Sequence, residues 1–103
     1  MTDRLSPTVR TDQLLDVALT LAARDGWQSL TRDGIALAAG VSSGLVTQRL
    51  GAMDQIRRSV MRRAVLRRVV RVVAEGLVAR CSYAGRADDT LRAECAALMG
   101  RKA

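Results

Sequence analysis

Apolar residues recur three or four positions apart along most of the chain, a spacing that predicts amphipathic helices. The first stripe follows Thr11, a residue that can cap a helix, and ends near Gly26, where a helix stop is expected. Its members are Leu14, Leu15, Ala18, Leu21 and Ala22. Residues 1–10 contain a proline and little apolar content, so we expect them to form a flexible arm.

Residues 31–51 predict two short helices joined by a tight turn. Thr31 and Ser42 are good N-caps, and each stands before a short segment of helical periodicity. Gly40 falls between the segments, where a residue without Cβ can take a positive φ at little cost. In the second helix Val46 and Leu50 are four positions apart and should face inward. This is the pattern of a helix-turn-helix, whose second helix enters the major groove of DNA.

Residues 11 to about 60 resemble the DNA-binding domain of the TetR family of repressors. The resemblance is carried by Asp25-Gly26-Trp27, Thr31-Arg32-Asp33, Ile35-Ala36, Ala39-Gly40-Val41-Ser42, Gly44 and the junction from Gly51 to Asp54. It implies an all-α fold with a three-helix helix-turn-helix domain over 11–52, double-stranded DNA as a partner, and a homodimer. The chain departs from the family at Thr47, where a tyrosine usually touches a phosphate, and at Met53, where a lysine often opens the next helix. The chain therefore lacks the side chains that make two positioning contacts in the family.

The predicted second helix leaves a polar face whose side chains suit contacts with DNA. Gln48 can offer its amide to an adenine edge, and Arg49 can pair with guanine or bind a phosphate. Leu45 can lie against a thymine methyl group, and Ser43 can bond a phosphate near the helix N-terminus. Gly44 lets the backbone approach the duplex closely. The full predicted set is Thr31, Arg32, Ser42, Ser43, Gly44, Leu45, Thr47, Gln48, Arg49 and Arg57.

Residues 53–103 are predicted to form a helical linker and dimerisation region. An apolar stripe runs from Met53 to Ala64, but its continuation would carry arginines, which a core does not tolerate. Over residues 66–77 the apolar positions point to nearly the opposite side. Either the helix breaks near Val65, or one long helix serves two surfaces. We favour one long helix, because no Gly or Pro interrupts residues 52–75.

A last helix is predicted from about Ala87 to Met99, with acidic residues at its start. Together with the 66–77 segment it should form a dimer interface, as a palindromic DNA site requires. The alternative is that both segments fold back on the core of their own chain. The predicted interface residues are Leu66, Val69, Val70, Val73, Leu77, Leu91, Cys95 and Leu98.

Composition narrows the class of function. The chain has no histidine, and Cys81 and Cys95 fall short of the four ligands of a structural zinc site. We find no pairing of a nucleophile with a base, so we expect no metal, no cofactor and no enzymatic activity. No apolar run reaches transmembrane length and the polar start is unlike a secretory signal, so we expect a cytoplasmic protein that does not enter a membrane.

The net charge of +7 is concentrated in residues 49–80, which hold nine arginines and two acids. A basic stripe beside a helix-turn-helix is what phosphate binding needs, and a solvated helix face is the alternative. The leading hypothesis is a sequence-specific repressor that binds a palindromic operator as a dimer, without a ligand domain. A DNA-organising or partition protein is one alternative. Another is a protein partner that docks through the C-terminal half and disables a full-length regulator.

Overall fold

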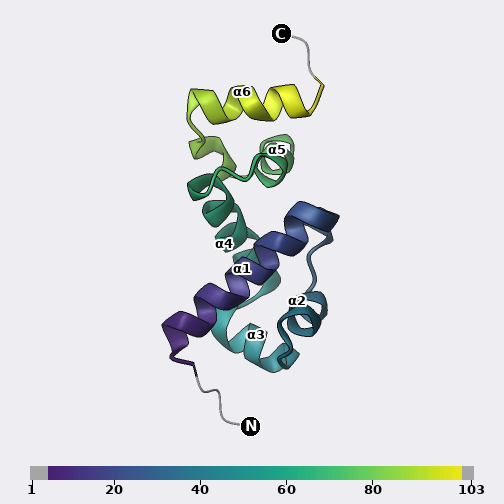
Figure 1. Cartoon of the computed structure of the whole chain (residues 1–103), viewed down its shortest axis with the longest axis vertical. Coiled ribbons are helices and arrows are strands. Elements are labelled where there is room, and N and C mark those ends of the chain that lie inside the picture. The colour runs from purple at the N-terminus through teal and green to yellow at the C-terminus, as the bar shows by residue number, and fades with distance from the viewer. Residues whose placement is uncertain (1–4, 101–103) are drawn as a thin grey trace.

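The computed structural model describes residues 5–100, and all regular structure within that range is helical (Figure 1). The expectation of an all-α fold is therefore confirmed. Two short 3-10 helices join longer elements: η1 (Trp27–Ser29) and η2 (Ala84–Arg86). The α-helices are α1 (Pro7–Asp25), α2 (Arg32–Ala39), α3 (Ser43–Leu50), α4 (Met53–Leu66), α5 (Val70–Val78) and α6 (Asp89–Leu98).

The first helix begins at Pro7 and not after Thr11, which corrects the flexible arm expected over 1–10. The Ser6 hydroxyl accepts a hydrogen bond from the Val9 backbone N–H at 3.2 Å, and so caps the helix. Pro7 suits the first helical position, because its missing N–H would have no partner within the helix there. Residues 1–4 of the predicted arm lie outside the described residues.

The α2–α3 pair has the predicted caps and the predicted turn. The Thr31 Oγ1 atom accepts from the Gly34 N–H at 3.0 Å, and the Ser42 Oγ atom accepts from the Leu45 N–H at 3.1 Å. Gly40 is left-handed, with φ 71° and ψ 33°. The Val41 N–H returns to the Ala36 carbonyl at 3.0 Å, which completes the hydrogen bonding of the α2 C-terminus.

The long helix that we favoured from the sequence is wrong, because the chain breaks after Leu66 and starts again at Val70. Arg68 takes a left-handed conformation with φ 57°, although no glycine stands there. A straight continuation would have carried arginines into the stripe that packs on α1. The break instead buries Val72 and Val73 completely.

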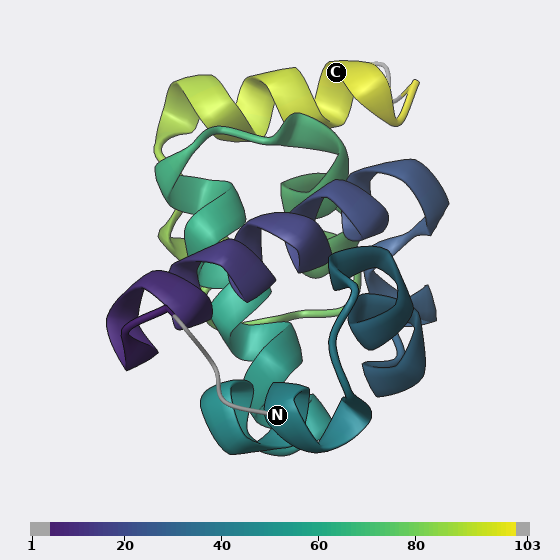
Figure 2. The ribbon, with the colours of Figure 1, turned by 60° about the horizontal axis from the view of Figure 1, so that its bottom comes forward.

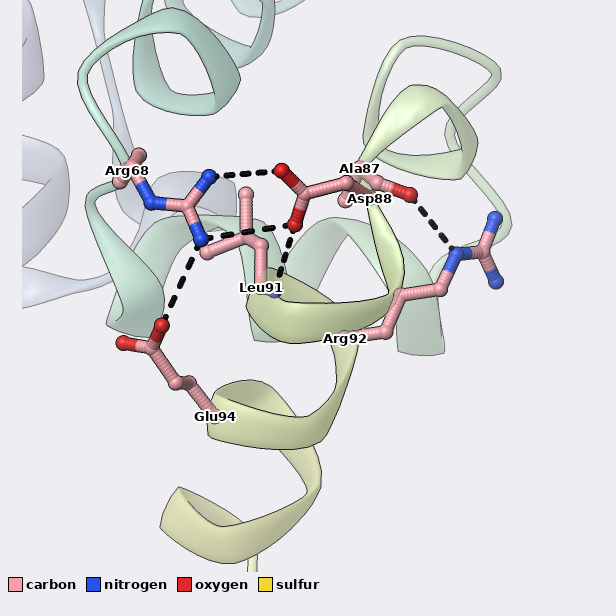
Figure 3. A network of polar contacts seen from close by, with 6 residues as sticks. All are labelled: Arg68, Ala87, Asp88, Leu91, Arg92 and Glu94. Atoms are coloured by element: carbon pink, nitrogen blue, oxygen red, sulfur yellow. Dashed lines mark hydrogen bonds and ion pairs between the residues drawn. The ribbon is translucent and has the colours of Figure 1, made fainter.

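Helix α6 holds this turn in place. The Arg68 guanidinium reaches Asp88 at 2.8 Å and Glu94 at 3.5 Å, and it lies between the turn and the start of α6 (Figure 3). Asp88 also caps α6, since its Oδ1 atom accepts from the Leu91 N–H at 2.7 Å. One exposed ion pair contributes little by itself. Here the shared carboxylate joins the left-handed turn to a helix start twenty residues later.

A single hydrophobic core runs through both halves of the molecule. Helix α1 packs against α2, α3 and α4, while α5 packs against α4 and α6. In both ribbon views α6 lies at the opposite end of the molecule from α3 (Figure 1, Figure 2). The core has fully or almost fully buried members from every α-helix, among them Leu14, Ile35, Val46, Ile56, Val73 and Leu91.

Trp27 is buried, and it ties three segments together. Its indole Nε1–H donates to the Arg57 carbonyl of α4 at 2.9 Å. Its backbone N–H and that of Gln28 each donate to the Glu75 carboxylate of α5 at 2.7 Å. Glu75 therefore connects α5 to η1, the segment between α1 and α2.

The predicted dimer interface needs correction, because much of it lies in the core of the chain itself. Val73, Leu91 and Cys95 are at most 1% exposed. The break after Leu66 turns α5 back onto α4, and α6 then covers α5. Val69, Val70 and Leu77 are partly buried against the same core. Only Leu66 and Leu98 of the predicted set are exposed, so the 66–77 stripe is not an open docking face for a partner protein either.

Candidate nucleic-acid interface

The outer face of α3 carries the side chains that the sequence assigned to DNA. Val46 and Leu50 point into the core, as predicted. The exposed positions are Ser42, Gly44, Thr47 and Gln48, and the partly exposed positions are Ser43, Leu45 and Arg49. The structure therefore brings seven of the ten predicted DNA-binding residues together on α3 and its N-cap.

Several hydroxyl groups on this face already have partners within the chain. The Ser43 hydroxyl donates to the Asp33 Oδ1 atom at 2.7 Å, which ties α3 to α2. The Thr47 hydroxyl donates to the Ser43 carbonyl at 3.2 Å. By contrast, the Gln48 side-chain amide makes no hydrogen bond within residues 5–100. Gln48 is therefore the polar side chain of α3 that can give both its donor and its acceptor to another molecule.

The other three predicted residues are Thr31, Arg32 and Arg57, and none of them belongs to α3. The Thr31 hydroxyl caps α2 and lines a depression beside Leu21 and Leu37. Arg32 is partly buried, and its Nε atom has no hydrogen-bond partner among the described residues. Arg57 bonds the Leu30 carbonyl at 3.5 Å and lines a depression to which α3 contributes no residue. The structure does not bring Arg57 to the α3 face.

A basic concavity adjoins the C-terminal end of α3. It is an open depression of about 420 Å³ whose lining, among the described residues, includes Arg49, Arg58 and Arg62 and no acidic residue. We did not single out Arg58 and Arg62 from the sequence. Their i, i+4 spacing, which places both on one face of α4, was the available signal. Within residues 5–100, the lining consists of Arg49, Leu50, Gly51, Gln55, Arg58, Ser59, Arg62 and Tyr83.

The arginines on the other side of α4 are paired with carboxylates. Arg63 contacts Asp12 at 2.8 Å and Asp16 at 2.7 Å, and Arg67 contacts Asp16 at 2.6 Å. Burial opposes the charge of Arg63, but its hydrogen bonds to Asp16 and Asp12 outweigh burial and raise its pKa. This side of α4 is thus an ion-paired contact with α1, while on the concavity side Arg62 has no carboxylate partner among the described residues.

The described residues contain no group of three or more His, Cys, Asp or Glu side chains placed to hold a metal ion. Cys81 and Cys95 are free thiols. Burial, and secondarily the charge of Glu94, raise the pKa of the Cys95 thiol. Its Sγ atom donates to the Val70 carbonyl at 3.6 Å, so this thiol serves the packing of α6 on α5.

Comparison with known protein families, with curated proteins and with solved structures found no match for the chain. Among residues 5–100, no helix has both the length and the apolar character needed to cross a membrane.

Proposed function

We propose that this chain is a sequence-specific double-stranded DNA-binding protein that regulates transcription, acting as a repressor by occluding a promoter. The observation that supports this most directly is the α3 surface. Gly40 turns the chain so that α3 crosses α2, Val46 and Leu50 anchor it, and Gln48 faces solvent with its amide unpaired within residues 5–100. An exposed helix of this kind, beside positive charge, suits the major groove.

In the proposed complex the side chains of α3 divide into base-reading and positioning groups. The Gln48 amide offers a donor and an acceptor to an adenine edge, and Leu45 contacts a thymine methyl group. Gly44 has no side chain, so the α3 backbone can come close to the duplex there. The site is open, because an added Cβ would meet only the Ser42 hydroxyl, at 3.8 Å. The hydrogen bond between Ser43 and Asp33 fixes the angle between α2 and α3 before DNA arrives.

The proposal includes two copies on a palindromic operator, because one α3 reads only a half-site. Leu66 and Leu98 are the exposed members of the interface predicted from sequence. Sedimentation of the chain with a duplex that holds one complete operator measures the stoichiometry. Two copies per duplex support this part of the proposal, and one copy contradicts it.

The test of sequence reading starts with selection of duplexes from a random pool, followed by fluorescence-anisotropy titration of the enriched duplex and a scrambled one. We expect a preference of roughly a thousandfold for the enriched sequence. Equal affinity for both duplexes after selection contradicts sequence reading.

Two substitutions make the test specific to α3. Gln48→Ala should lower the preference about tenfold, because it removes one amide contact with a base edge. Gln28→Ala removes an equally exposed glutamine side chain on η1 and should leave the preference unchanged. A preference that survives Gln48→Ala contradicts the role assigned to that residue.

A further inference from the structure

We infer that the basic concavity between α3, α4 and η2 is a phosphate-binding site, and that its ligand is a phosphodiester of the DNA backbone beside the bases that α3 reads. This inference rests on the proposed function. It adds the C-terminal half of the chain to the DNA interface, through Tyr83.

The residues that line the concavity favour the binding of an anion. Of residues 5–100, three arginines and no acidic residue line it, and Ser59 adds a hydroxyl group. The Gln55 Oε1 atom accepts from the Ala52 N–H at 3.0 Å, which leaves its NH₂ group directed to other acceptors. Guanidinium, hydroxyl and amide N–H groups are the donors that phosphate oxygens accept from. The start of α4 lies beside them and adds the positive end of its helix dipole.

The charges of Arg58 and Arg62 are available to a ligand. Among the described residues, no carboxylate lies within 4.0 Å of the Arg62 guanidinium, and Arg62 is exposed. Arg58 contacts Asp54 at 3.4 Å, with both side chains about half exposed or more. Such a surface pair is weak and exchanges readily with a phosphate. On the opposite side of α4, Arg63 is engaged by two carboxylates and is mostly covered.

The position of the concavity points to the backbone of the same duplex. Arg49 ends the predicted base-reading face of α3 and also lines the concavity, so the two surfaces are continuous. Arg58 and Arg62 are separated by one helical turn, roughly 6 Å along α4. The phosphates of one strand recur about every 3.4 Å along the duplex axis. The two arginines are therefore spaced to contact two different phosphates of one strand.

The C-terminal half extends the positive surface. Tyr83 precedes η2 and lines the concavity, and the Arg86 guanidinium lies 4.9 Å from the centre of the Tyr83 ring. This cation–π contact restrains the ring and places another positive charge beside it. Through Tyr83 and the α4 arginines, the C-terminal half contributes side chains to the proposed interface.

The test compares two charge-removing variants of the full chain. The double variant Arg58→Gln with Arg62→Gln removes two guanidinium groups from the concavity. Arg71→Gln removes one exposed arginine of α5 that, within residues 5–100, has no carboxylate partner either, and it serves as the control. Affinities for the enriched and scrambled duplexes are measured between 50 and 200 mM salt.

For the double variant we expect weaker binding to both duplexes by the same factor. The slope of log affinity against log salt should fall by about 1.8, since each phosphate contact contributes about 0.9. Arg71→Gln should keep the wild-type slope. A wild-type slope in the double variant overturns the assignment of the concavity to the DNA backbone. A lowered slope without any preference between duplexes supports the phosphate site and contradicts the proposed reading of bases.

A second measurement separates the DNA backbone from a free phosphate as the source of the ligand. NMR titration with pyrophosphate should shift the backbone amide signals of Gln55 and Ser59 in the wild-type chain and not in the double variant. If the chain binds no duplex, these shifts still support a phosphate site, with a free phosphate compound as its ligand. The absence of both the slope change and the shifts overturns the inference.

Discussion

The α2–α3 and α4–α5 hairpins end their first helix with the same backbone motif but with different residues. In the first, the Val41 N–H returns to the Ala36 carbonyl at 3.0 Å, around Gly40 at φ 71°. In the second, the Val69 N–H returns to the Ala64 carbonyl at 2.9 Å, around Arg68 at φ 57°. Both are Schellman motifs, and only one has the expected glycine.

The difference shows how a left-handed turn can be stabilised from outside. Glycine takes positive φ at little cost, so the α2–α3 turn is encoded locally. An arginine there is strained, and the strain persists because the surrounding structure holds it. That structure includes Asp88 and Glu94 of α6, which bind the Arg68 guanidinium. The first turn therefore depends on one residue, and the second depends on a helix that comes later in the chain.

The largest expected effect on stability comes from adding a methyl group to α5, and the same change in α3 serves as the comparison. A Cβ at Gly76 of α5 would meet the Met61 Sδ atom at 2.7 Å and the Ala84 Cβ atom at 2.8 Å, so Gly76→Ala should destabilise the fold by roughly 1–3 kcal/mol. Gly44→Ala of α3 meets only the Ser42 hydroxyl and should stabilise by roughly 0.5 kcal/mol. Urea denaturation measures both changes. A Gly76→Ala variant as stable as the wild type would contradict the close α4–α5 crossing.

The next effect tests the glycine of the first turn. An added Cβ at Gly40 meets no atom within 4 Å, so Gly40→Ala tests the backbone conformation alone. We expect a loss of roughly 1–2 kcal/mol in the free energy of unfolding. Gly85→Ala is the matched control, because that Cβ also meets nothing and the residue is not left-handed. Equal stability of the two variants would contradict the left-handed turn.

A smaller effect separates the two contributions at the second turn. Arg68→Gly relieves the positive φ and loses the contacts with Asp88 and Glu94, two changes of opposite sign. Arg68→Ala loses the contacts and keeps the strained conformation, so it should melt several degrees below Arg68→Gly. Thermal denaturation followed by circular dichroism gives the order. Identical melting temperatures would argue against a left-handed residue at this position.

The smallest effect concerns pH. The Arg68 guanidinium, and then the Leu91 N–H, hold the pKa of Asp88 below its ordinary value of 3.8. A lowered pKa in the folded state means that this contribution to stability is present above pH 3.8 and is lost as pH falls through the folded-state value. Asp88→Asn should flatten the stability profile in that acidic range. An unchanged profile would show that Arg68 does not lower the pKa of Asp88.

The sequence was sufficient for the features whose causes are local. A few neighbouring residues are enough to predict Gly40, the caps Thr31 and Ser42, and the inward-facing pair Val46 and Leu50 on α3. The Arg68 turn does not, because its support comes from Asp88, twenty residues later, and because no Gly or Pro marks it. The same distance explains the error over the dimer interface. An apolar stripe shows that a surface is covered, and it cannot show whether α6 or a second copy covers it.

The basic concavity was missed for a related reason. The count of arginines over 49–80 indicated positive charge but not which arginines keep it. That depends on Asp12 and Asp16 of α1, which pair with Arg63 and leave Arg62 free of carboxylates within residues 5–100. Which charged residues form a binding surface therefore depends on which of them the fold pairs with residues of opposite charge.

The Glu75 carboxylate controls how fast two backbone amide protons exchange with solvent. It holds the backbone N–H groups of Trp27 and Gln28, and Gln28 lies at the surface where solvent could otherwise reach its amide. These two amide protons can exchange with solvent only when the carboxylate of α5 releases them. In a hydrogen-exchange experiment, a pair of amides between α1 and α2 should therefore report how often a carboxylate nearly fifty residues away releases them.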